Sequence, residues 1–395
     1  MGALSHLKVI DLSRVLAAPW ASQMLADFGA QVIKIEHPDG GDDTRGWGPP
    51  YLTDSDGNPT TESAYFMSAN RGKQSVCIDI ATEAGQSHVR QLVSSADVFL
   101  ENFKVGGLAK YGLDYESLAA LNPQLIYCSV TGFGQTGPER HRPGYDALIQ
   151  AMGGLMSITG AADVDGGEPQ KVGVALTDIM TGLYATIGIL TALTEREQSG
   201  LGQHIDLALL DVTAATLANQ ATNYLVGGMV PERIGNAHPS IVPYQVFAAA
   251  DGHLMLAVGN DHQFRRLCDV LDLPALASDA RFATNTDRVA HREDLVAMLA
   301  ARFSERERDS WLTACAAANV PAGPINRIDE VFEHPQLQAR GMRVNIPHPL
   351  NPDLQLPGNP IHMSRTPPQP SKPPPMLGEH TAAVLDTLQI DRTSG

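Results

Sequence analysis

The sequence is poor in cysteine. Its 395 residues include only four, Cys77, Cys128, Cys268 and Cys315, which lie far apart and form no C-x-x-C pair. This spacing excludes a disulfide framework and a thiolate metal site of the usual kinds. We therefore expect a reducing compartment, and the first six residues lack the basic and apolar runs of a targeting signal. Together these features predict a cytoplasmic protein.

The sequence is also poor in charge, and basic runs are absent. Charged residues make up 18% of the chain, the formal net charge is −16, and no segment is rich in Lys or Arg. A nucleic-acid interface needs a broad basic face, so nucleic acid is not an expected partner. A compact anionic ligand is still compatible with this charge, because salt screens distant acidic groups within about 10 Å.

Several catalytic motifs are missing as well. There is no Walker A loop, no H-E-x-x-H and no G-x-S-x-G, and the 13 histidines have no ligand spacing. We therefore expect neither a metal enzyme nor a serine hydrolase. A G-x-G-x-x-G does occur at 132–137, but Pro138 and Pro143 follow it where a dinucleotide site needs a helix. An NAD-dependent dehydrogenase is kept as an alternative on this motif.

One long apolar segment, Val174 to Leu193, could pass for a membrane span. It contains an aspartate, two glycines and four threonines, which favours a buried helix of a soluble domain, with no membrane partner. Asp178 lies near the start of that helix. It has two interpretations, a helix N-cap or a desolvated carboxylate that acts as a covalent nucleophile on an acyl group.

Short apolar runs alternate with helical patterns through the first part of the chain. This spacing predicts a doubly wound α/β domain with a ligand crevice beyond the carboxyl ends of its parallel strands. We expect strands at 7–12, 31–36, 75–80, 97–101 and 124–130, with helices at 19–28, 82–95 and 114–121.

The pattern then changes, and three segments are predicted. Residues 1–225 form the large Rossmann-like domain, 226–330 form a smaller α+β domain, and 331–395 return to the large domain. The small domain is expected to contain strands at 241–247 and 254–258 and helices at 263–271 and 293–303. The last segment carries six prolines between 367 and 375 and ends in a helix at about 380–388.

Several motifs resemble the class III coenzyme A transferases, the CaiB/BaiF type. They include residues 7–12, 29–36, 41–45, 96–103, 132–138, 200–203 and 377–381, together with the Asp178 segment. The resemblance implies an interlocked homodimer that takes an acyl-CoA and a carboxylate as substrates, with no tightly bound cofactor and no metal. In this family an aspartate, here Asp178, forms an acyl anhydride and then an aspartyl-CoA thioester.

The resemblance also implies a site for coenzyme A. The matching positions are Leu16, Ala17, His37, Ile78, Asp79, Ile80, Ala81, Asn102, Phe103, Lys104, Lys110, Tyr145 and Asp146. Leu16 and His37 depart from the formyl-CoA transferases, which have glutamine and arginine there. The 2-methylacyl-CoA racemases have a histidine at the position of Tyr145, and a phenol with a pKa near 10 is a poor base at neutral pH.

Segments 41–50 and 237–245 look most like the succinyl-CoA:glutarate transferases of this family. The expected reaction is therefore CoA transfer from an acyl-CoA such as succinyl-CoA to a dicarboxylate such as glutarate. Transfer of the formyl-CoA/oxalate or carnitine type and 2-methylacyl-CoA racemisation are the alternatives. Arg45, a lone arginine in a Gly- and Asp-rich loop, is the candidate ligand for the acceptor's carboxylate; the competing interpretation is that it pairs with Asp42, Asp43 or a phosphate of CoA.

Overall fold

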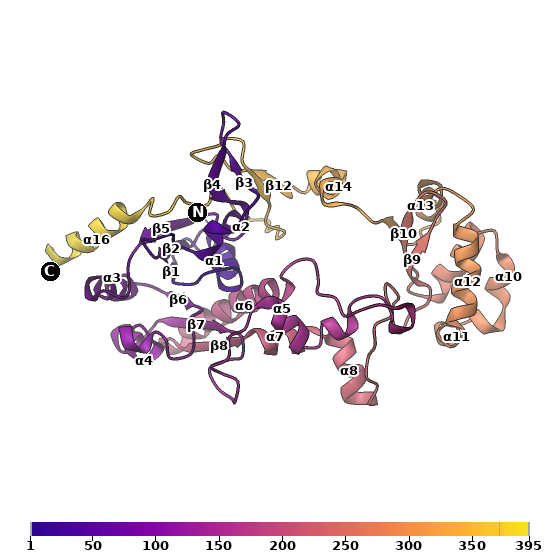
Figure 1. The fold of residues 1–395 in the computed structure, drawn as a ribbon, viewed down its shortest axis with the longest axis horizontal. Coiled ribbons are helices and arrows are strands. Elements are labelled where there is room, and N and C mark those ends of the chain that lie inside the picture. Colours follow the sequence, from indigo (N-terminus) through magenta and orange to yellow (C-terminus); the bar gives the residue numbers. More distant parts are fainter. Residues whose placement is uncertain (1, 371, 394–395) are drawn as a thin grey trace. The chain divides into compact units, whose positions relative to one another are not determined.

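A computed structural model describes residues 2–370 and 372–393. The chain divides into two compact units, coloured by sequence in Figure 1. The large unit comprises Met1–Leu155, Lys171–Met229 and Pro335–Gly395, and the small unit comprises Met156–Gln170 and Val230–His334.

The small unit thus includes a segment, 156–170, that the sequence analysis placed in the large domain. Backbone and side-chain contacts explain the grouping: Gly235 N donates to Gly160 O at 3.1 Å, and Arg233 forms an ion pair with Asp163. These contacts join residues 70 or more positions apart, which sequence periodicity cannot show.

A six-stranded parallel sheet organises the large unit. Its order in space is β5-β2-β1-β6-β7-β8, and its strands are β1 (Lys8–Asp11), β2 (Gln31–Glu36), β5 (Lys73–Cys77), β6 (Val98–Glu101), β7 (Ile126–Thr131) and β8 (His204–Ala208). The expected α/β class and parallel sheet are confirmed. The strand order reverses between β1 and β6, and ligands bind such sheets at that point, beyond the carboxyl ends of the strands.

Helices cover both faces of this sheet. Neighbouring residues of one strand point to opposite faces, so Val9 belongs to one core and Ile10 to the other. The first core includes helices α1 (Ala17–Asp27), α6 (Leu176–Ser199) and α7 (Leu209–Thr216). The second includes α3 (Glu83–Val93), α4 (Tyr115–Leu121) and the carboxyl-terminal α16 (Thr381–Thr393). Helix α16, near the carboxyl end of the chain, therefore packs on the same unit as β1, near its amino end (Figure 1).

Helix α6 is the long apolar segment, and it is a core helix of the large unit. It is long and apolar enough to cross a membrane, yet one face, including Ala185 and Ile189, is buried against α1 and the sheet. The two helices touch at Gly182, where a Cβ atom would lie 2.6 Å from the carbonyl oxygen of Ala17. This contact brings the amino-terminal turn of α6 beside the loop that precedes α1.

The remaining elements of the large unit are short. They are β3 (Tyr51–Thr53) and β4 (Pro59–Ser63), which form a hairpin, β12 (Arg343–Asn345) and β13 (Gln355–Pro357), which form another, and helices α2 (Ala64–Ser68), α5 (Asp146–Met152), α8 (Ala218–Gly227) and α15 (Pro335–Ala339).

The small unit has its own core, built around Phe264, Phe303 and Trp311. A three-stranded antiparallel sheet of β9 (Tyr244–Ala248), β10 (His253–Ala257) and β11 (Ala322–Pro324) packs with α9 (Asp261–Val270), α10 (Pro274–Ser278), α11 (Asn285–Ala290), α12 (Arg292–Phe303), α13 (Arg308–Ala317) and α14 (Ile328–Glu333). The sequence patterns at 254–258, 263–271 and 293–303 correspond to β10, α9 and α12.

Candidate active site

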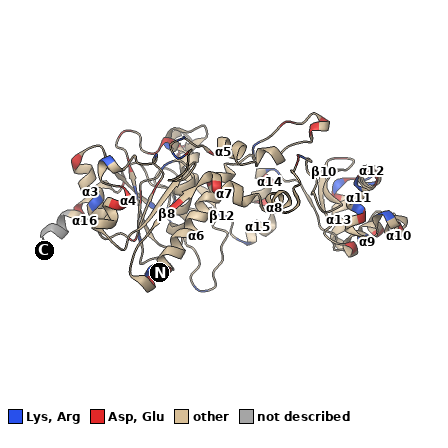
Figure 2. Ribbon diagram, turned by 90° about the horizontal axis from the view of Figure 1, so that it is seen from below, with Lys and Arg blue, Asp and Glu red and all other residues tan. Residues whose placement is uncertain are grey.

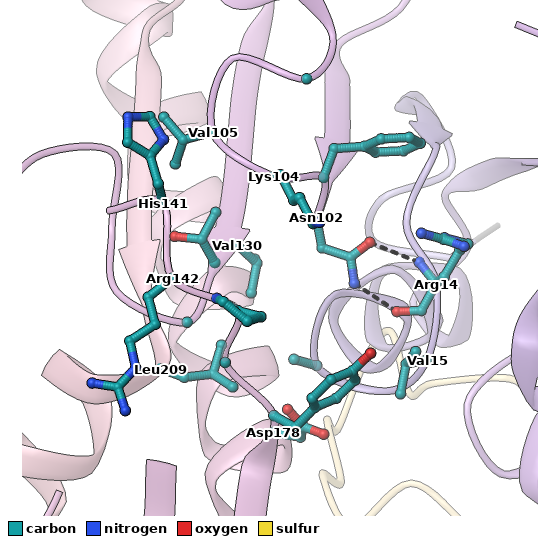
Figure 3. Close-up of a pocket in the computed structure, with 18 of the residues that line it drawn as sticks. Arg14, Val15, Asn102, Lys104, Val105, Val130, His141, Arg142, Asp178 and Leu209 are labelled. Carbon is teal, nitrogen blue, oxygen red and sulfur yellow. Dashed lines mark hydrogen bonds between the residues drawn. The ribbon is translucent and has the colours of Figure 1, made fainter. Parts of the chain in front are cut away.

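A cavity of about 440 Å³ opens at the carboxyl edge of the sheet, beside the loops that follow the paired strands β1 and β6, and every residue that lines it belongs to the large unit. The loops after β1, β6 and β7 and the first turns of α5 and α6 form its wall (Figure 3). Of the positions that the sequence analysis singled out, it brings together Leu16, Ala17, Asn102, Phe103, Lys104, Lys110, Tyr145, Asp146 and Asp178.

Asp178 lies at one end of this cavity, in the first turn of α6 (Figure 3). Asp178 is 9% exposed, and no described residue donates a hydrogen bond to its carboxylate oxygens. Burial, followed by the charge of Asp146, raises the pKa of Asp178 to about 7. A carboxylate with few hydrogen bonds and a raised pKa is a better nucleophile than a solvated one.

The N-cap interpretation of Asp178 is wrong. Ala175 is the N-cap residue of α6 and makes no side-chain cap. Asp146 of α5 satisfies the helix end instead, because its Oδ1 accepts hydrogen bonds from the backbone N of Thr177 (2.9 Å) and of Asp178 (3.3 Å). Gln150 Nε2 donates to its other oxygen at 2.7 Å. Asp178 is therefore free of a capping role.

Tyr65, which the sequence analysis did not single out, lies near enough to these two carboxylates for their charges to affect its pKa, although it does not line the cavity. Burial raises the pKa of Tyr65, and the charges of Asp178 and Asp146 raise it further. Its ring packs edge-on against Trp47, with centroids 5.0 Å apart. No local signal marks Tyr65, because the short helix α2 that carries it follows a hairpin outside the main sheet.

The loop after β6 is joined to the loop after β1 by one side chain. Asn102 donates from Nδ2 to Arg14 O at 2.6 Å and accepts at Oδ1 from Arg14 N at 2.9 Å, the two dashed bonds in Figure 3. The amide thus satisfies a backbone donor and acceptor across the switch point of the sheet. Asn102 shapes the cavity, and its amide is already paired with the protein.

Basic side chains gather around the cavity in an otherwise acidic chain. Acidic and basic residues are interspersed over the ribbon in Figure 2, yet the cavity lining includes Arg14, Lys104, Lys110, Arg140, His141 and Arg142. Only the two lysines were expected. A further sequence signal for this basic cluster was the run 140–142, which follows the Gly-rich loop and contributes three of these residues. Such a cluster suits an anionic ligand.

Five of the positions predicted for CoA binding lie outside the cavity lining. His37 and Asp79 follow β2 and β5, and His37 Nε2 lies 3.9 Å from Asp79 Oδ1. Ile78 is 5% exposed and packs in the core under α3, so its side chain is not available to a ligand. Ile80 and Ala81 continue from there towards α3, and Ala81 N donates to Asp79 Oδ1 at 2.9 Å.

Arg45, the expected acceptor ligand, is engaged elsewhere. Its Nε and Nη2 donate to the two carboxylate oxygens of Glu36, each at 2.8 Å, and its guanidinium lies 3.7 Å from the ring centroid of Phe66. Arg45 is 9% exposed and does not line the cavity. The competing interpretation was also wrong about its partner, which is a carboxylate at the end of β2. The structure gives Arg45 a role in holding the loop.

Replacing Arg45 by Gln should destabilise the protein. The change leaves Glu36 buried without its charge partner, which typically costs about 3–5 kcal/mol. Chemical denaturation would measure the loss, and adding Glu36→Gln should recover part of it. The KM values for a dicarboxylate and a monocarboxylate acceptor should change by similar factors; a rise confined to the dicarboxylate would return Arg45 to acceptor binding.

The G-x-G-x-x-G motif does not form a dinucleotide site. The loop after β7 leads through an irregular segment before α5 begins at Asp146, so no helix amino terminus follows the glycines. Its first glycine has a packing role: a Cβ on Gly132 would lie 2.7 Å from the Cα of Gly144. This close approach of two backbones places Tyr145 and Asp146 at the cavity.

The fold and the cavity together define an enzyme class: a doubly wound α/β protein with a desolvated carboxylate beside an anion-binding crevice. The chain belongs to CoA-transferase family III, whose model matches residues 4–381. Over 394 residues it is 54% identical to a succinate–glutarate CoA-transferase of Agrobacterium fabrum, covering 99% of this chain and 97% of the relative.

Two further comparisons agree. The chain is 42% identical to the human succinyl-CoA:glutarate CoA-transferase, over 98% of this chain and 86% of the relative. The crystal structure of a CAIB/BAIF family protein from Brucella suis superposes with a TM-score of 0.86 at 51% identity, over 98% of this chain and 99% of that one. The resemblance found in the sequence is thus confirmed, and the NAD-dependent alternative is set aside.

Proposed function

We propose that this enzyme transfers CoA from succinyl-CoA to glutarate or a dicarboxylate of similar length, with Asp178 as the nucleophile. The observation that carries the chemistry is the buried Asp178 carboxylate, to which no described residue donates a hydrogen bond, in a cavity lined by basic residues. The relatives named above support the choice of substrates.

The reaction proceeds through covalent intermediates on Asp178. A carboxylate oxygen of Asp178 attacks the thioester carbonyl carbon and the C–S bond breaks. CoA thiolate departs, and a mixed anhydride between Asp178 and the donor acyl group remains. The thiolate attacks the aspartyl carbonyl, which releases the donor acid and forms an aspartyl-CoA thioester. The acceptor carboxylate displaces the thiolate again, and attack of the thiolate on the acceptor's carbonyl gives the new acyl-CoA and restores Asp178.

The basic residues supply the binding of CoA in this proposal. Its phosphates are anionic, and Lys104, Lys110, Arg140 and Arg142 are exposed side chains on two loops that face the same cavity. His37 and Asp79 lie further along the same edge of the sheet, where an extended ligand would reach them. Neither a metal nor a further cofactor enters this reaction.

A panel of acceptors tests the substrate assignment. The enzyme is incubated with succinyl-CoA and, separately, glutarate, adipate, oxalate, formate, carnitine or butyrate, and the acyl-CoA products are identified by mass. Glutarate should give glutaryl-CoA at the highest rate, with little transfer to butyrate. Transfer to oxalate, formate or carnitine in preference to any longer dicarboxylate would overturn the assignment.

We infer that the enzyme is an interlocked homodimer of the cytoplasm, as the family resemblance implies. Apolar side chains exposed in the single chain support an extensive contact: Tyr184 and Ile187 on α6, and Leu225 and Val226 on α8 are 40–83% exposed. An area of this kind usually marks a protein interface. We infer that a second copy of this chain covers these apolar side chains on α6 and α8.

Dilution should leave such a dimer intact. Two interlocked chains separate only if one of them unfolds, so the mass measured by mass photometry at nanomolar concentration should remain that of the dimer. Circular dichroism of the same sample provides the control for folding. A monomer that forms reversibly and keeps the native spectrum would contradict the interlocked arrangement.

A further inference from the structure

Val15 has an unusual backbone conformation at the edge of the cavity. Its φ is +72°, in the left-handed region that a β-branched residue rarely occupies. Arg14, Val15, Leu16 and Ala17 all line the cavity that contains Asp178. Strain of this kind persists only where surrounding groups hold the backbone, and it concentrates at functional sites.

The neighbours of Val15 are held from several sides. Asn102 binds both backbone polar groups of Arg14 (Figure 3). Before it, Ser13 O accepts a hydrogen bond from Lys34 Nζ at 2.8 Å, and Ser13 N donates to Asp11 Oδ1 at 2.9 Å. Each of these bonds fixes a neighbour, and one further bond reaches the strained residue itself.

That bond comes from Asp42, whose Oδ1 accepts from Val15 N at 3.2 Å. Asp42 is 1% exposed, and its Oδ2 lies 2.9 Å from Lys34 Nζ, also fully buried. Its own backbone N donates to Glu36 Oε2 at 3.1 Å, the carboxylate that Arg45 holds. Asp42 thus connects a buried charge network to the turn of the cavity wall, although its side chain does not line the cavity.

The conformation of this turn bears on Asp178 through direct packing. The carbonyl of Ala17 lies against Gly182, one turn along α6 from Asp178. If Val15 relaxed to negative φ, the chain direction into Leu16 and Ala17 would change, and with it the wall beside the nucleophile. The bond from Asp42 opposes that relaxation.

We propose that Asp42 is a positioning residue for CoA transfer: fixed by Lys34, it holds Val15 in the left-handed conformation that sets Leu16 and Ala17 beside Asp178. The inference rests on the proposed function. Asp42 touches neither the substrates nor the reacting atoms, so its effect should appear in the rate of acylation more than in the KM for acyl-CoA.

The test measures the single-turnover acylation of Asp178 by saturating succinyl-CoA without an acceptor, as succinate released per folded enzyme when the aspartyl-CoA thioester forms. Asp42→Ala should slow this step at least tenfold, and Asp42→Asn, which keeps an acceptor oxygen but loses the charge, three- to fivefold. Val15→Gly alone should stay within threefold of the wild type. Glycine adopts positive φ at little cost. Adding Val15→Gly to either Asp42 variant should therefore raise the acylation rate of that variant at least threefold.

The controls separate positioning from stability. Asp39, exposed in the same loop, provides the matched variant Asp39→Ala, which should acylate like the wild type. A merely structural Asp42 would lower thermal stability without slowing acylation, and Val15→Gly would rescue nothing; either result overturns the inference. If Asp42→Ala does not fold, the test rests on Asp42→Asn. An acylation rate of Asp42→Asn equal to that of the wild type overturns the inference. A wild type that forms no acyl-enzyme would instead overturn the proposed function, and this inference with it.

Discussion

Replacement of Asp178 by Asn should reduce CoA transfer at least a thousandfold. An amide cannot supply the carboxylate oxygen that forms the anhydride, so the covalent route through Asp178 is closed. The two other described carboxylates that line the cavity are engaged: Asp146 is bound by the α6 backbone and by Gln150, and Asp43 is paired with Arg14. The fold should persist, because Asn has nearly the same volume and the Asp178 side chain forms no hydrogen bond with another described residue.

The measurement combines steady-state turnover with mass analysis of the protein after incubation with acyl-CoA and hydroxylamine. The wild type should carry a modification on Asp178 alone, and Asp178→Asn should carry none. Asp211→Asn is the matched control, because Asp211 is also the third residue of its helix, α7, but is exposed and outside the cavity. Residual activity of the variant above about one per cent, or a modification at another residue, would place the nucleophile elsewhere.

The sheet and the position of Asp178 could be predicted from the sequence because both have local signals, whereas the role of Asp178 as a nucleophile came from the family resemblance. Apolar strands at α/β spacing predict a doubly wound sheet without knowledge of any distant contact. Asp178 stands out because a carboxylate is rare within an apolar helical segment. Strand β8 (His204–Ala208) was missed, since only Ala208 of its five residues is buried at this edge of the sheet. The buried Lys73 likewise hid the true start of β5, which lies two residues before the predicted one.

The local environment of Arg45 was not predictable for a physical reason. An arginine in a Gly- and Asp-rich loop has several acidic neighbours, and the pattern does not show which carboxylate it faces. The partner, Glu36, ends a strand nine residues earlier. The carboxyl-terminal segment also contacts this loop, because Arg45 Nη2 donates to Pro375 O at 3.1 Å. A contact across 330 positions leaves no trace in local periodicity.

The conformation of Val15 is a second feature that the local sequence does not predict. Intrinsic preference argues against a left-handed valine, and the groups that hold the turn, Asn102 and Asp42, come from other loops. The function of the loop therefore depends on contacts that oppose local preference. Departures of this kind are expected at functional sites, where a fold gives up local consistency for a particular geometry.

The Asp178→Asn variant should also be more stable than the wild type at alkaline pH. The pKa of Asp178 is raised from 3.8 to about 7 by burial and by Asp146. In the unfolded chain the group loses its proton near pH 3.8, but in the folded chain it keeps the proton up to about pH 7. Ionisation therefore penalises the folded state increasingly as pH rises between these values, and the full penalty above pH 7 is at most about 4 kcal/mol.

Asn cannot ionise, so the variant escapes this penalty. Its gain in unfolding free energy should be about 3 kcal/mol larger at pH 8 than at pH 4.5, where most of the penalty is absent from the wild type as well. Urea denaturation at the two pH values, at fixed protein concentration because the proposed dimer would contribute to stability, would measure this difference. Asp211→Asn should show no such dependence on pH. An equal change at both pH values, or a loss of stability at pH 8, would mean that Asp178 is ionised without strain in the folded enzyme, which would remove the physical basis assigned here to its reactivity.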